Sequence, residues 1–149
     1  YISEFNQLYK EFDAVYHSAA IRSGLSDCAF WILYILIDAK EPIKQSELSD
    51  NARMSRQTVN SALKKLEKDG YVTLKRIEGT AGKSIHLTEK GSSFVHENIV
   101  PVMQAEIRAC ESFPGEDIRT FLISFRALVE RMDREIRSVT EVRRKKSIE

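Results

Sequence analysis

The chain has 149 residues, of which 42% are hydrophobic and 30% are charged, so it is long enough for one globular domain and lacks the composition of a disordered protein. No apolar run approaches the roughly 20 residues that cross a membrane. Two cysteines are too few for a disulfide framework and are typical of a reducing compartment. These properties predict a soluble, cytoplasmic protein.

The net charge of +1 conceals an uneven distribution along the chain. Residues 1–43 contain three basic and six acidic side chains, whereas residues 92–149 contain ten of each. Residues 44–91 contain ten basic and six acidic side chains and form the positive segment. A local excess of Lys and Arg is typical of phosphate-binding proteins, although an excess of this size also occurs on mixed surfaces.

The first part of the chain predicts two helices. Apolar side chains recur every three or four residues over residues 2–20, which is the pattern of one helix face. A second helix begins at Ser26 and is apolar on all sides between residues 29 and 37. A helix without a polar face is expected to be central, so we expect Trp31 and Tyr34 mainly in the core.

Residues 45–70 predict two short helices joined by a tight turn. The first helix covers residues 45–52, and the second is capped by Ser55 and ends before Gly70. The buried stripe of the second helix consists of Val59, Leu63 and Leu66. Two such helices form a helix-turn-helix, in which the second helix enters the major groove of DNA.

The outer side of this second helix has an unusual composition. It carries amides, hydroxyls and basic groups, namely Arg56, Gln57, Asn60, Ser61, Lys64, Lys65 and Lys68. No carboxylate falls on this side until the helix is ending. Amides and hydroxyls hydrogen-bond base edges, and Lys and Arg neutralise phosphates, so the composition suits a DNA major groove. The alternative is an ordinary solvated amphipathic helix.

After Gly70 the helical period gives way to alternation, which indicates β-strands. Two alternating runs, with Val72 and Leu74 inward in the first and Ile85 and Leu87 inward in the second, enclose a tip that contains glycine. A hairpin directly after a helix-turn-helix is the wing of a winged helix. Arg76 and Lys83 would place positive charge near an adjacent minor groove or its phosphates.

The remaining residues predict long helices. Thr88 caps a helix that tolerates Gly91 and continues beyond Pro101, where we expect a kink. A last helix opens at Glu116, with apolar side chains at close to heptad spacing over about three repeats. We expect dimer contacts from the first and last helices, at Phe5, Leu8, Phe12, Phe121, Phe125, Leu128 and Met132. The alternative is packing on their own chain alone, and the basic tail over residues 143–146 is expected to be solvated.

Catalytic and metal-binding patterns do not stand out. The three histidines and two cysteines lack the spacing of metal ligands, and no Ser, His and Asp order or pair of carboxylates is evident. We therefore expect a protein that is not an enzyme and that holds no metal or cofactor.

The order of these elements and several stretches of sequence resemble the MarR family of winged-helix transcription regulators. The resemblance covers about residues 5–140 and is carried by GLSDCAFWILYIL, IKQSELSDNARMSRQTVNSALKKLEKDGYV and IHLTEKG, followed by two long helices. It implies a mainly α fold with a small β-hairpin wing. Residues 26–91 would form the DNA-binding lobe, and residues 1–25 and 92–149 would form the dimerisation region of a single intertwined domain.

The resemblance also implies a homodimer that represses transcription from a pseudo-palindromic site in double-stranded DNA. DNA contacts are expected from Gln45, Ser55, Arg56, Gln57, Thr58, Asn60, Ser61, Lys64, Lys65, Arg76 and Lys83. Many family members carry Asp and Arg in the wing, where this chain reads EGTAGKS. Because Lys lacks the planar fork of Arg, we expect the second helix of the helix-turn-helix to read more of the sequence than usual.

A small aromatic or phenolic effector that relieves repression is a further implication of the resemblance. The candidate contacts lie on the first two helices, near which the family's pockets form, and are His17, Arg22, Trp31 and Tyr34. Arg or His would pair with a carboxylate while the aromatic rings stack, and core packing or a surface role is the alternative for each. A different class of function, a winged-helix module that binds a protein partner without specific DNA binding, also fits the sequence.

Overall fold

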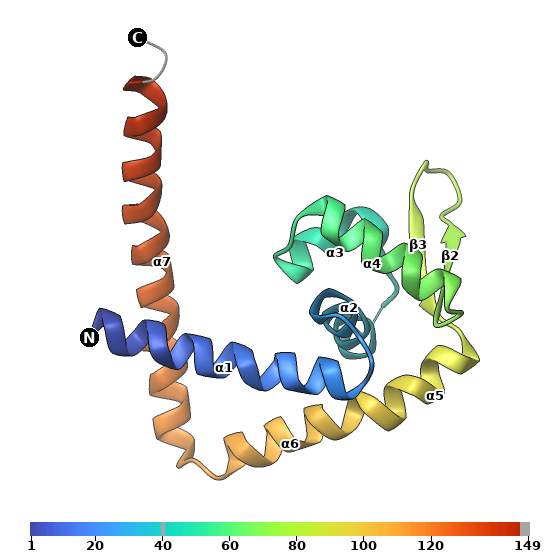
Figure 1. Ribbon diagram of the computed structural model, residues 1–149, viewed down its shortest axis with the longest axis horizontal. Helices are drawn as coiled ribbons and strands as arrows, with labels where there is room; N and C mark the ends of the chain where they lie inside the picture. Colours follow the sequence, from blue (N-terminus) through green and yellow to red (C-terminus); the bar gives the residue numbers. More distant parts are fainter. Residues whose placement is uncertain (40, 147–149) are drawn as a thin grey trace. The chain divides into compact units, whose positions relative to one another are not determined.

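The structure is a computed structural model that describes residues 1–39 and 41–146, with side chains as far as residue 140. The side chains of the basic tail at residues 143–146 therefore lie outside the described part. The elements in chain order are α1 (Ile2–Arg22), α2 (Asp27–Asp38), β1 (Ile43–Lys44), α3 (Gln45–Ala52), α4 (Arg56–Lys68), β2 (Val72–Arg76), β3 (Lys83–Leu87), α5 (Glu89–Asn98), α6 (Val100–Glu111) and α7 (Gly115–Lys146) (Figure 1). The predicted mainly helical fold with a small β wing is confirmed.

The chain divides into two compact units, residues 1–104 and residues 105–149. The first unit contains α1 to α5, the sheet and the start of α6, and the second contains the end of α6 and α7. Within the described residues, no single helix has the length and apolar composition needed to cross a membrane. Helices α1 and α2 meet that test only as a pair, across a bend of 89°.

The core of the first unit is built around α2, as its uniformly apolar sequence predicts. The side chains of Phe30, Ile32 and Leu33 are fully buried. The N-cap Ser26 fixes the start of the helix, because its hydroxyl accepts a hydrogen bond from the Ala29 amide at 3.3 Å. Other elements contribute fully or almost fully buried side chains to the same core, namely Leu48 of α3, Leu63 and Leu66 of α4, and Ile85 of β3. Complete burial of each large apolar side chain contributes roughly 2 kcal/mol.

Helices α3 and α4 form the predicted helix-turn-helix. Arg53, the residue after α3, has a left-handed backbone with φ 53°, which turns the chain sharply. The hydroxyl of Ser55 then accepts from the Thr58 amide at 3.1 Å and caps α4. Gly70 follows α4 with φ +79°, in the left-handed region that glycine adopts without strain.

The wing is part of a three-stranded antiparallel sheet in the order β1-β3-β2. The predicted hairpin of β2 and β3 is present, with Leu74 opposite the buried Ile85. The two-residue strand β1 joins it, with Ile43 opposite the same Ile85. The sequence predicts only a short extended segment there, because two residues are too few to show alternation.

The junction between the wing and α5 corrects the interpretation of Gly91. The hydroxyl of Thr88 caps α5 by accepting from the Gly91 amide at 2.9 Å, and it donates to the Gly70 carbonyl at 2.6 Å. Gly91 lies so close to the preceding chain that a Cβ atom there would overlap the carbonyl oxygen of Tyr71. Gly91 is therefore required by close packing rather than merely tolerated in a helix.

The kink expected at Pro101 takes the form of a break between two helices. Helix α5 ends at Asn98, Ile99 lies between the helices, and α6 begins at Val100. Pro101 is the second residue of α6, where its missing N–H costs no helical hydrogen bond.

Helices α1 and α7 both expose large apolar side chains. On α1, the side chain exposure is 59% for Leu8 and 62% for Phe12. On α7, it is 57% for Phe121 and 37% for Phe125 and Leu128, and the Phe121 and Phe125 rings stack with centroids 5.6 Å apart. Of the remaining residues expected in the dimer, Phe5 and Met132 are half-buried.

Candidate nucleic-acid interface

The outer face of α4 is exposed to solvent, as a nucleic-acid contact requires. The following α4 side chains that are expected to reach DNA are exposed, namely Arg56, Gln57, Asn60, Ser61, Lys64 and Lys65. Gln45, at the start of α3, is half-buried. Val59, Leu63 and Leu66 on the opposite side are buried to 1% exposure and hold the helix on the core. The first turn of α4 contains no acidic residue, which leaves its positive dipole end available to an anion.

Side chains from three elements meet in one groove beside this face. Gln45 begins α3, Arg56 and Asn60 belong to α4, and Lys83 begins β3 at the wing tip. These four residues line a groove of about 360 Å³. The structure thus brings together expected DNA-binding residues that are up to 38 positions apart in the sequence. Two of them offer amides and two offer positive charge, which is the combination that base edges and phosphates require.

The wing tip beside this groove is held by hydrogen bonds between residues close in the sequence. The Ile77 amide donates to the Gly82 carbonyl at 3.1 Å, and the Gly82 amide donates to the Thr80 hydroxyl at 3.1 Å. At the base of the tip, Arg76 and Lys83 are directly opposite each other on β2 and β3. Like charges in such positions repel, and a phosphate between or beside them would relieve the repulsion.

Three other expected DNA contacts have more specific surroundings. The hydroxyls of Ser55 and Thr58 lie 2.7 Å apart and hydrogen-bond each other, so both already serve the start of α4. Lys65 borders a small cavity with Gly24 and Leu25, on the side of α4 next to the turn between α1 and α2. Ser55 and Thr58 thus stabilise the interface helix, and Lys65 lies at its flank.

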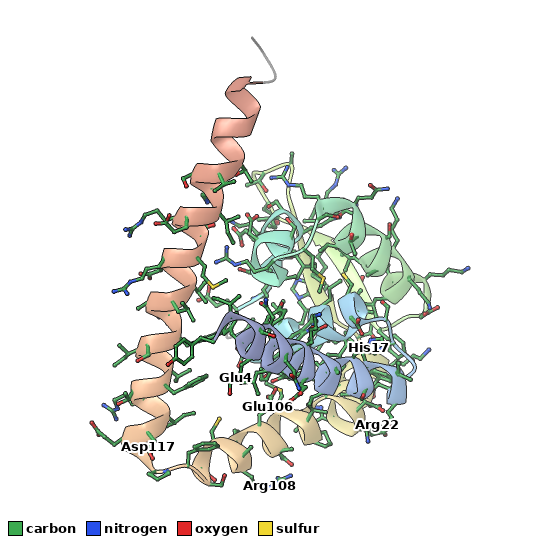
Figure 2. The ribbon with its side chains drawn as sticks, turned by 60° about the vertical axis from the view of Figure 1, so that its left-hand side comes forward. Glu4, His17, Arg22, Glu106, Arg108 and Asp117 are labelled. Atoms are coloured by element: carbon green, nitrogen blue, oxygen red, sulfur yellow. The ribbon has the colours of Figure 1, made fainter. Side chains whose placement is uncertain are left out.

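The four expected effector contacts are not brought together. The Nδ1 atom of His17 lies 2.8 Å from a carboxylate oxygen of Asp27, and the Arg22 guanidinium donates to the Ser18 carbonyl at 3.2 Å. Figure 2 shows both His17 and Arg22 on α1. Trp31 and Tyr34 instead line a cavity of about 530 Å³. Both side chains pack against the core as expected, and because they are only half-buried, the rest of their surface faces this cavity.

Other residues that line this cavity were not predicted from the sequence. Asp38 comes from α2, Asn51 from α3, and Met54 from the turn before α4. The signal for Asp38 is its spacing, because Trp31 and Asp38 are seven residues apart and fall on one face of α2. Asn51 and Met54 carry no comparable signal, since they reach the cavity through the tertiary fold alone.

Other reactive groups offer no second site. In the described part of the chain, no three or more His, Cys, Asp or Glu side chains gather as a metal site would require. Burial raises the pKa of the Cys28 thiol, because the thiolate is poorly solvated in the core. Cys28 therefore stays a neutral thiol within the apolar core.

A helix-turn-helix followed by a β wing, with a polar and basic outer helix, defines a winged-helix protein. Residues 23–81 match the sequence model of the MarR family. No curated protein matches the chain in sequence. The chain therefore has the winged-helix fold, and its residues 23–81 are similar in sequence to the MarR family.

Solved structures share this fold over most of the chain. A MarR family regulator from Neisseria meningitidis is 18% identical, with a TM-score of 0.77 over 91% of this chain and 95% of that one. MepR of S. aureus, solved with DNA, is 15% identical, with a TM-score of 0.69 over 89% and 97%. NadR, solved with 4-hydroxyphenylacetate, is 17% identical, with a TM-score of 0.69 over 84% and 89%. At these identities the likeness concerns the fold.

Proposed function

We propose that this protein is a transcriptional regulator that binds double-stranded DNA as a homodimer and represses transcription from a pseudo-palindromic operator until a small effector binds. The observation that carries the proposal is the groove in which Gln45, Arg56, Asn60 and Lys83 meet from three elements. No enzymatic activity is proposed.

The geometry supports a division of work within the interface. Helix α4 places Gln57 and Asn60 on its exposed face, where their amides can pair with base edges in a major groove. Lys64 on the same helix and the facing pair of Arg76 and Lys83 on the wing supply charge for phosphates. In this arrangement α4 reads sequence, and the wing mainly adds affinity and orientation.

The comparisons support the partners in this proposal. MepR has been solved with DNA and NadR with 4-hydroxyphenylacetate, and both share the fold of this chain. The exposed apolar side chains of α1 and α7 support a second copy as the partner of these helices. A homodimer has two-fold symmetry, so its operator is expected to contain two half-sites about one helical turn, roughly 10 base pairs, apart.

The test is selection of duplexes from a random pool by the full chain, followed by affinity measurements on the enriched sequence at several salt concentrations. We expect an enriched inverted repeat and a log-linear loss of affinity with salt, with a slope near −0.9 for each phosphate contact. The enriched duplex should bind at least about 1,000-fold more tightly than a shuffled duplex. Equal binding of the two duplexes at every salt concentration would exclude a sequence-specific regulator.

The second candidate function is a winged-helix module that binds a protein through the same α4 face. The exposed amides and hydroxyls of that face are compatible with it. This function predicts no enrichment of any duplex and no salt slope on DNA, so the selection experiment also distinguishes the two candidates.

A further inference from the structure

The cavity lined by Trp31 and Tyr34 has the size and shape of a small-molecule site. Its volume is about 530 Å³, within the range of roughly 300–1,000 Å³ that is usual for such sites. It lies at the end of α2, beside β1 and the last turn of α3. Trp31, Tyr34, Ile35 and Met54 give it a largely apolar lining.

The aromatic wall of this cavity is held by neighbouring rings. The centroids of Trp31 and Tyr34 are 5.3 Å apart, and Tyr16 of α1 packs on Trp31 at 4.7 Å. Phe30, fully buried in the core, contacts both Trp31 and Tyr34. Side chains fixed in this way lose little further conformational entropy when a ligand binds.

The described residues that line the cavity carry a negative charge. Asp38 is the only charged side chain among the described residues that line it. Asp38 is also exposed, so its carboxylate is accessible to a ligand from solvent. The cavity further receives the C-terminal ends of α2 and α3, neither of which has a basic residue in its last turn. Helix C-termini carry partial negative charge, and Arg53, which follows α3, is not among the lining residues.

An aromatic carboxylate would find no cation among these lining residues. His17 and Arg22, the expected partners of such a carboxylate, hydrogen-bond Asp27 and Ser18 instead. A cation would meet favourable groups on every side, because aromatic faces, a carboxylate and helix C-termini all attract positive charge.

We propose that this cavity binds an organic cation with an aromatic or bulky apolar body and a single ammonium group. The body stacks on Trp31 and Tyr34, and the ammonium lies at Asp38. This inference rests on the proposed function, because it gives the chemical class of the effector of the proposed regulator.

The test compares three probes that share one ring and differ in charge, namely tyramine, 4-hydroxyphenylacetate and the neutral alcohol tyrosol. Trp31 is the single tryptophan of the chain, so its fluorescence reports directly on this cavity. Isothermal titration calorimetry provides a second readout on the full chain. We expect tyramine to bind about tenfold more tightly than tyrosol and 4-hydroxyphenylacetate to bind most weakly.

Variants then assign the preference to a residue. Asp38→Asn keeps the size of the side chain and should weaken tyramine about three- to tenfold while leaving tyrosol unchanged. Asp50→Asn is the matched control, since Asp50 is exposed on α3 and does not line the cavity. It should leave both affinities unchanged, and far-ultraviolet circular dichroism checks the fold of each variant.

Equal or tighter binding of 4-hydroxyphenylacetate, or an unchanged tyramine affinity in Asp38→Asn, would overturn the inference. If the protein prefers 4-hydroxyphenylacetate but still selects an operator, the cation site is excluded and the proposed regulator is retained. If the protein binds tyramine as expected but selects no operator, the cation site is retained and the proposed regulator is excluded.

Discussion

The proposed function gives single residues on α4 separable roles. Gln57 and Asn60 are exposed amides, whereas Lys64 is an exposed point charge on the same helix. Gln57→Ala and Asn60→Ala should each reduce the discrimination between the operator and a singly mismatched operator by roughly 1–3 kcal/mol. This discrimination is measured as the ratio of two dissociation constants at one salt concentration.

Lys64→Ala should act differently, because phosphates carry no sequence information. We expect it to weaken operator and shuffled duplex alike and to lower the salt slope by about 1. Lys10→Ala is the control, since Lys10 is an exposed cation on α1 and outside the proposed interface. A uniform loss of affinity in all three α4 variants would mean that the amides position the helix and do not read bases.

Cys28 and Cys110 should differ in reactivity, because one thiol is buried and the other is exposed. Cys28 is 7% exposed and its pKa is raised by burial, whereas Cys110 is exposed on α6. A raised pKa lowers the thiolate fraction at any given pH, and the thiolate is the form that alkylates. At neutral pH we therefore expect iodoacetamide to label Cys110 first and Cys28 only after denaturation, as read by peptide mass spectrometry. Faster labelling of Cys28 would contradict its buried position.

At the scale of elements, the contact of α5 with the segment between α4 and β2 depends on a glycine. A methyl group at Gly91 would overlap the carbonyl oxygen of Tyr71, and backbone atoms yield less readily than a side chain. Gly91→Ala should therefore destabilise the protein by about 3 kcal/mol, measured by urea unfolding.

Gly115→Ala provides the matched control for this substitution. A Cβ at Gly115, the first residue of α7, meets no atom within 4 Å. This change should be neutral or stabilise by up to about 1 kcal/mol, because alanine favours the helix. Equal effects of the two substitutions would show that α5 moves away from Tyr71 at little cost.

Elements with local signals were predicted well from the sequence. One segment contains all the signals for α4, namely the cap at Ser55, the period of Val59, Leu63 and Leu66, and the left-handed Gly70. The bounds of α4 agree with the prediction to within two residues. The alternation of the hairpin is equally local.

Features made by residues distant in the chain were not predicted. The need for Gly91 arises from Tyr71, twenty residues earlier, and glycine alone is also compatible with simple tolerance. The pairing of β1 with β3 joins segments about forty residues apart. The acidic cavity likewise depends on the ends of α2 and α3 meeting, so only Trp31 and Tyr34 among its residues were candidates.

At the scale of the whole molecule, the proposed homodimer would cover exposed apolar side chains on α1 and on α7. Side chains such as Phe12 and Phe121 are 62% and 57% exposed, and each helix carries several more. Soluble proteins rarely leave large apolar patches uncovered. Because neither side chain is buried within the chain, replacing it by Asp should disturb the winged-helix core little.

If the protein is the proposed dimer, Phe12→Asp and Phe121→Asp should each shift its mass toward the 17.1 kDa of the single chain in sedimentation velocity at micromolar concentration. Asn6→Asp is the control, because it adds the same charge to an exposed polar position of α1 and should leave the dimer intact. Since each lobe would then bind one half-site alone, the salt slope on the operator should fall to about half. An unchanged dimer mass in both Phe variants would place the dimer interface elsewhere, whereas a lost dimer with an unchanged slope would show that one lobe makes all the phosphate contacts.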